Sequence, residues 1–133
     1  MRKFKTLIRQ VSGLPNPTAE IKLQRNGILV TFSNNRSQAI STDRQNDRYV
    51  MTSVVLGRRR VRRIGRSRLL PLFWQRNREA NMVAFSLDKR GRLVGQIEQL
   101  TETIDPQELA LYIELLAREC DQFEYALSGK DLE

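Results

Sequence analysis

The chain has 133 residues, of which 40% are hydrophobic and 29% charged, and its net charge is +8. This composition is typical of a soluble globular protein, and the length predicts that residues 1–133 form a single domain. No apolar run approaches the ~20 residues that span a bilayer, and the basic start is not followed by the apolar stretch of a secretory signal. We therefore expect a cytoplasmic protein that makes no membrane contact.

The charge is divided unevenly along the chain. Residues 1–78 carry 18 Lys/Arg against 3 Asp/Glu, and residues 79–133 carry 5 against 12, so their net charges are +15 and −7. A chain charged in this way can attract a partner of either sign or a second copy of itself. The asymmetry is also compatible with nucleic-acid binding.

Apolar periodicity predicts a short helix followed by a group of strands. The helix lies near the N-terminus, where one face carries Phe4, Leu7, Ile8 and Val11. Alternation around Ile21 and Leu23, with a hairpin signal at Asn26-Gly27, predicts two antiparallel strands. Residues 38–43 are a weaker strand candidate, and residues 48–57 a stronger one because they are rich in β-branched side chains. Three or four antiparallel strands in succession are predicted.

The stretch GRRRVRRIGRSR, from Gly57 to Arg68, holds seven arginines in twelve residues and is predicted to be a loop. Three interpretations stay open. The arginines could bind an anionic partner such as nucleic acid, pair with the acidic second half of the chain, or simply be solvated. The candidate anion-binding residues are Arg58, Arg59, Arg60, Arg62, Arg63, Arg66 and Arg68.

A central helix is predicted next. Ser67 could cap it, but Pro71 is best tolerated in a first turn, which favours a start near Leu70. Its apolar residues are expected to pack in the core or to form a dimer or client interface, and the aromatic pair could alternatively stack on bases. The candidate interface residues are Leu69, Leu72, Phe73 and Trp74.

The second half predicts a hairpin and a long helix. Val83, Phe85 and Leu87 alternate on the first strand, the turn lies at residues 88–91, and the second strand places Leu93, Gly95, Ile97 and Gln99 on one face. Gly95 is expected to allow a bend or a close approach.

The last helix starts at the cap Asp105 and runs about 20 residues to Ser128-Gly129. Its apolar stripe is Leu109, Tyr112, Ile113, Leu116, Cys120, Phe123 and Leu127. Leu111 and Leu115 add a second apolar edge, expected to pack rather than to bind a client unless it is exposed.

The residue types argue against catalysis. The chain has no histidine and one cysteine, so the usual general base and the Ser-His and Cys-His nucleophile pairs are absent. Cys120 lies on an apolar helix face, where an unreactive thiol is expected. No glycine-rich phosphate motif and no ligand-spaced carboxylate cluster are present. We therefore expect a protein that is not an enzyme and that has no cofactor and no metal site.

The second half also resembles known proteins. An asparagine-containing segment (residues 77–81), an F-x-L-D-x-x-G-R-L-V hairpin (residues 85–94) and a D-P-x-E-L helix start (residues 105–109) are similar to the YbjN family and, more distantly, to the type III secretion chaperones. The resemblance implies an α+β fold with a curved antiparallel sheet of about five strands covered by helices, in the order α-β-β-β-α-β-β-α. It also implies a homodimer formed through the central helix, and no catalysis. Secretion chaperones tend to be acidic, whereas this chain is basic.

These observations predict a non-enzymatic domain that binds another macromolecule, as a chaperone-like or adaptor protein that holds a protein segment. The alternative is a nucleic-acid-binding protein that uses the segment from Arg58 to Arg68.

Overall fold

The computed structural model describes residues 6, 9–11, 19–25, 27–45, 48–79, 82–100 and 104–128. The elements in chain order are β1 (Ala19–Gln24), β2 (Gly27–Phe32), β3 (Ser37–Gln45), β4 (Arg48–Leu56), α2 (Arg58–Ile64), α3 (Arg66–Glu79), β5 (Ala84–Leu87), β6 (Leu93–Leu100) and α4 (Pro106–Ser128).

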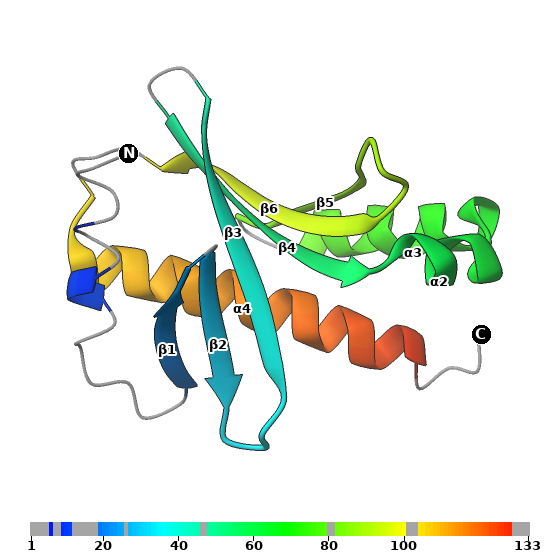
Figure 1. The fold of residues 1–133 in the computed structure, drawn as a ribbon. Coiled ribbons are helices and arrows are strands. Elements are labelled where there is room, and N and C mark those ends of the chain that lie inside the picture. Colours follow the sequence, from blue (N-terminus) through cyan, green and yellow to red (C-terminus); the bar gives the residue numbers. More distant parts are fainter. Residues whose placement is uncertain are drawn as a thin grey trace.

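The six strands form one antiparallel sheet in the order β1-β2-β3-β4-β6-β5. Figure 1 shows a curved sheet with α4 crossing one face, while α2 and α3 lie at the end near β5. The register of β4 against β6 shifts twice, between Tyr49 and Met51 and between Val54 and Leu56, and such irregularities bend strands. The predicted α+β class with a curved, helix-covered antiparallel sheet is confirmed, with six strands in place of about five.

The extra strand comes from the front of the chain. All four strand candidates there form strands, including the weak one, because β3 is paired on both sides by β2 and β4. The first hairpin is confirmed, but Gly27 pairs with Gln24 and so begins β2 rather than lying in the turn. Asn26 lies outside the described residues. In the predicted first helix, Thr6 and residues 9–11 are helical and Val11 is buried, whereas Phe4, Leu7 and Ile8 lie outside the described residues.

The helical part differs from the prediction in two places. The arginine segment is a helix, α2, instead of a loop. The central helix α3 starts at Arg66 rather than near Leu70, so Pro71 lies inside it. Proline at this position removes the hydrogen bond that its N–H would donate one turn back. Helix α4 begins as predicted: the Asp105 carboxylate accepts a bond from Gln107 N–H at 2.8 Å.

Helix α4 supplies one side of the core. It packs on β4, β3 and β6, and the predicted stripe is confirmed, with Tyr112 half-buried and the remaining members fully buried: Leu109, Ile113, Leu116, Cys120, Phe123 and Leu127. Facing them on the sheet are buried side chains of alternating positions, such as Ile28, Val30 and Ile40. This contact removes most of the large apolar side chains from water, which is the main stabilising term in a domain of this size.

Gly95 permits a close approach between α4 and the sheet. A Cβ atom at this position would lie 2.5 Å from Cys120 Sγ and 3.0 Å from Cε1 of Phe85. The predicted close approach is therefore confirmed. Leu93 and Ile97 are buried on the same face, as predicted, and the Gln99 side chain lies outside the described residues.

Asn77 ties the end of α3 to the edge strand β5. Its side-chain nitrogen donates to Phe85 O at 2.9 Å, and its Oδ1 accepts from Phe85 N–H at 2.6 Å. The amide thus satisfies both backbone groups of a residue whose neighbour on the other side is β6. This gives a physical role to the first residue of the asparagine-containing segment; Asn81, the last, lies outside the described residues.

We expect Gly95→Ala to lower the free energy of unfolding by about 1–3 kcal/mol, because the added methyl group must displace packed side chains. Urea unfolding followed by circular dichroism measures this change. In a Cys120→Ala background the same substitution should cost less, because the nearest atom is gone. Equal costs in the two backgrounds would contradict the proposed contact.

Candidate functional site

The arginine segment folds as a helix because two apolar residues anchor it. Val61 and Ile64 are buried, one turn apart, and arginine is a good helix former. Gly65 then ends α2 with a φ of 96°, a conformation that favours glycine, and α3 starts immediately after it. The side chains of the seven arginines therefore point in several directions around α2 and the first turn of α3.

Arg60 is the member of the segment that pairs with the acidic half of the chain. Its guanidinium lies 3.5 Å from the Glu124 carboxylate and donates to Ser128 Oγ at 2.5 Å. Arg36, from the front half, contacts α4 in the same way: it donates to the buried Asp121 at 2.7 Å and lies over the Tyr125 ring. The basic and acidic halves are thus joined at two points along α4.

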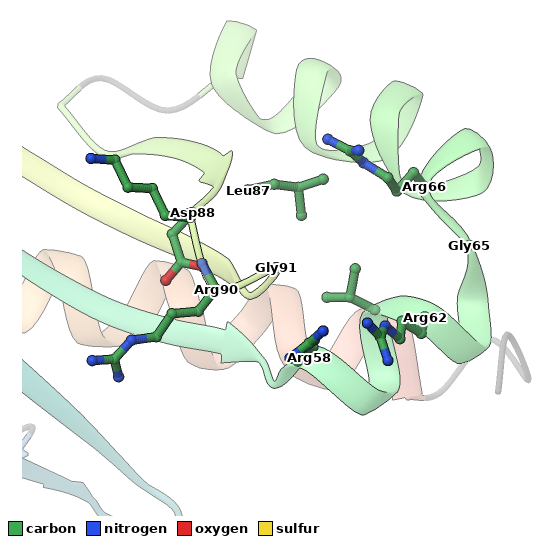
Figure 2. A pocket seen from close by; sticks show the side chains of 10 residues that line it. Arg58, Arg62, Gly65, Arg66, Leu87, Asp88, Arg90 and Gly91 are labelled. Carbon is green, nitrogen blue, oxygen red and sulfur yellow. The ribbon is translucent and has the colours of Figure 1, made fainter.

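Other arginines of the segment surround a hollow of about 680 Å³. Figure 2 shows Arg58 and Arg62 on its α2 side and Arg66 opposite them on α3, while the turn between β5 and β6 closes a further side. Apart from the half-buried Arg60, all the arginines of the segment are exposed, and Arg59, Arg63 and Arg68 do not line this hollow. The structure therefore sorts the segment into one paired side chain, three that face a hollow, and three on the outer surface.

The turn beside the hollow is held by Asp88. Its Oδ1 accepts from the N–H groups of Arg90 and Arg92 at 3.0 and 2.8 Å, and its Oδ2 accepts from Arg92 Nε at 2.8 Å. Burial alone raises the pKa of this carboxyl, but the hydrogen bonds and charge of Arg92, with the Arg90 bond, outweigh burial and hold the pKa below its usual value. The Asp88 carboxylate is therefore ionised, and its hydrogen bonds are made within the turn.

The four predicted interface residues on α3 differ in exposure. Leu69 is fully buried, Leu72 and Phe73 are half-buried against the core, and Trp74 is 61% exposed. Leu70, which the sequence did not single out, is 49% exposed one turn before Trp74. The i, i+4 spacing of these two residues was the signal that could have identified them. Leu69 is thus a core residue, and the large apolar side chains that α3 exposes most are Leu70 and Trp74.

Helix α4 also exposes apolar side chains on its outer side. The expectation that Leu111 packs is wrong for this chain, because Leu111 is 65% exposed, whereas Leu115 is half-buried. Tyr125 is equally exposed, although the guanidinium of Arg36 lies 4.5 Å from its ring centroid. Exposed apolar side chains mark a protein contact where they form a contiguous patch, whereas single ones are common on any protein surface.

Comparison with solved structures finds two that are similar in fold. A chain of the crystal structure of the ExsC-ExsE complex aligns over 92% of this chain and 92% of its own length, with a TM-score of 0.58 and 15% identity. A chain of the HopA1-SchA chaperone-effector complex covers 92% and 93%, with a TM-score of 0.57 and 13% identity. The fold of this chain is therefore type III secretion-chaperone-like. No family model matches the sequence, and no curated protein does.

The thiol of Cys120, the single cysteine of the chain, is unreactive in this fold. Cys120 lies on α4 and is fully buried against Gly95 of β6. Burial raises its pKa to about 12 from an ordinary 9.0. Because the thiolate is the nucleophile, the thiol is unreactive near neutral pH.

Among the described residues, no three Cys, Asp or Glu side chains gather as metal ligands would. None of the helices in that part of the chain is long and apolar enough to cross a membrane.

We expect Cys120 to resist a disulfide reagent at neutral pH in the folded protein and to react fully in denaturant. Because its pKa is higher in the folded state than in the unfolded state, its contribution to stability is complete below pH 9.0 and is lost as pH rises toward about 12. Cys120→Ala should therefore lose less stability than the wild type over this interval. Rapid labelling of the folded protein would contradict this account.

Proposed function

We propose that the protein is a non-enzymatic, chaperone-like protein that holds a segment of a partner protein, in the cytoplasm. The observation that carries this proposal is the match to the two solved complexes over nine-tenths of the chain. In each of them a protein of this fold was solved in complex with another protein. The likeness concerns the fold, so the partner of this chain is to be identified by experiment.

The surface chemistry supports a protein partner. Leu70 and Trp74 on α3, and Leu111 and Tyr125 on α4, expose large apolar side chains on two separate helices. Burying such side chains against a partner releases water, and aromatic anchors commonly carry much of the binding energy. We assign the two surfaces to different contacts, the α3 surface to a second copy of the chain and the α4 surface to the held segment.

The α3 assignment is a homodimer proposal. Trp74 is flanked by Leu70 one turn earlier and by Arg78 one turn later, whose guanidinium lies 5.1 Å from the Trp74 ring centroid. In an isologous dimer the same surface of both copies is in contact, so each of these apolar side chains is buried once in each copy. A helix with two such side chains and few other apolar groups in contact with water is suited to this arrangement.

We expect the wild type to be a dimer by size-exclusion chromatography with light scattering, and the Leu70→Ser/Trp74→Ser variant to be a folded monomer. Both side chains are exposed, so the substitutions should leave the core intact. Leu111→Ser/Tyr125→Ser is the matched control on α4 and should stay dimeric. A monomeric wild type, or a dimeric α3 variant, would refute the α3 assignment.

Affinity capture from native lysate of the source organism tests the function itself. The immobilised wild type, treated with nuclease and washed at high salt, should retain one protein, and limited proteolysis of the complex should leave a protected segment of it. Leu111→Ser/Tyr125→Ser should lose that protein. The R58A/R59A/R62A/R63A variant, which keeps the paired Arg60, should retain it.

The nucleic-acid alternative predicts the opposite pattern. In that case nuclease and high salt would remove everything that was captured, because each phosphate contact releases counterions. The four-arginine variant would then bind nothing. This outcome would reject the chaperone-like function.

A further inference from the structure

We infer that the hollow between the α2–α3 corner and the β5–β6 turn is a binding site for a compact organic phosphate, a small molecule that carries two or more phosphate groups on an apolar body. The site does not depend on the proposed chaperone-like function. It uses a different part of the surface and a different chemistry from the exposed apolar side chains of α3 and α4.

The positive charge of the hollow is uncompensated. Among the described residues, Arg58, Arg62 and Arg66 have no carboxylate partner and no hydrogen-bond acceptor, in contrast to Arg60 on the same helix. Figure 2 shows the three side chains on two facing walls, with the Arg66 guanidinium extended toward Leu87. These three exposed like charges lie around one hollow and repel each other weakly through solvent, and an anion between them would relieve that repulsion.

The acidic residue of the hollow does not neutralise this charge. Asp88 accepts three hydrogen bonds within the β5–β6 turn, two from backbone N–H groups and one from Arg92, which forms an ion pair with it at 2.8 Å. Lys89 and Arg90 add further positive charge to the rim, although Figure 2 shows the Arg90 side chain turned away from the hollow. The net charge facing the cavity is therefore positive.

The hollow has the size and the lining of a small-molecule site. Its volume of about 680 Å³ lies within the ~300–1,000 Å³ that is usual for such sites. Among the lining residues Leu87 is half-buried, so an apolar contact is available beside the charged groups, whereas Val61 is almost fully covered. A ligand with an apolar body and several negative charges matches this combination.

Both walls are set by backbone geometry. Gly65 has a φ of 96° at the α2–α3 corner, and Gly91 has a φ of 79° in the turn, conformations that residues with a side chain rarely adopt. The aliphatic part of Arg58 lies beside Gly91, where an added Cβ would be 3.5 Å from Arg58 Cγ. The turn therefore positions one of the three arginines, so part of the site exists before a ligand binds.

Phosphate fits this arrangement better than a carboxylate or a nucleic-acid strand. A phosphate group offers oxygens in several directions and accepts paired hydrogen bonds from planar guanidinium groups, whereas a carboxylate offers two oxygens in one plane. A nucleic-acid strand needs cations in a row along its backbone, and these three arginines instead surround one cavity.

Calorimetric titration of the purified protein with inorganic tripolyphosphate and with ATP tests the site. We expect saturable binding of both at one site per chain, with ATP binding more tightly because of its apolar body. Arg58→Gln/Arg62→Gln should weaken both by at least about tenfold, as expected for the loss of two charge-assisted hydrogen-bonding groups. Arg59→Gln/Arg63→Gln, which removes the same charge from the same helix outside the hollow, should bind within about threefold of the wild type.

Four results would overturn the inference: no saturable binding of either probe, equal weakening by the two double variants, oligonucleotides that bind more tightly than ATP and gain affinity with length, and an oligoglutamate peptide that binds more tightly than tripolyphosphate. The third would indicate an extended nucleic-acid surface, and the fourth an acidic protein segment. The first two results leave the capture experiment unaffected, because the protein partner is tested there through the α4 surface.

Discussion

Helix α4 is held against the middle of the sheet through a contact that tolerates no extra atom. Cys120 Sγ occupies the place where a side chain on Gly95 would stand, so the distance between helix and sheet is fixed at this point. The apolar stripe on either side of Cys120 packs on β4, β3 and β6. This packing positions the acidic partners of Arg36 and Arg60 and the exposed Leu111, because α4 carries all of them.

The uneven charge of the chain has a simple structural outcome. The acidic groups of α4 meet a small part of the basic half, through Asp121 and Glu124. The remaining arginines of α2 and of the start of α3 are spread by the helical turn of 100° per residue into separate directions. One dense run in the sequence therefore yields side chains with different surroundings, and a single role for all seven does not follow from their proximity in the sequence.

Much of the fold could be predicted from local patterns. The alternation of apolar and polar residues predicted the strands, and the turn residues predicted the hairpins. Asp105 and Pro106 predicted the start of α4. Each of these signals acts within a few residues. Helix α2 could not be predicted in this way, since only Val61 and Ile64 in it are apolar and glycines flank it on both sides. The exposure of Leu111 and the burial of Leu69 depend on which elements come to lie beside them, and the grouping of Arg58 and Arg66 with Leu87 depends on a turn more than twenty residues farther along the chain.

The position of Trp74 has a practical consequence. It is the only tryptophan of the chain, and it is 61% exposed on the outer side of α3. In a monomer its indole is therefore largely in contact with solvent before unfolding as well as after it, so the emission of a monomer will barely change on denaturation. The same ring will move to a drier environment, and its spectrum to the blue, when something covers α3. The fluorescence of Trp74 therefore reports on whether the α3 surface is covered.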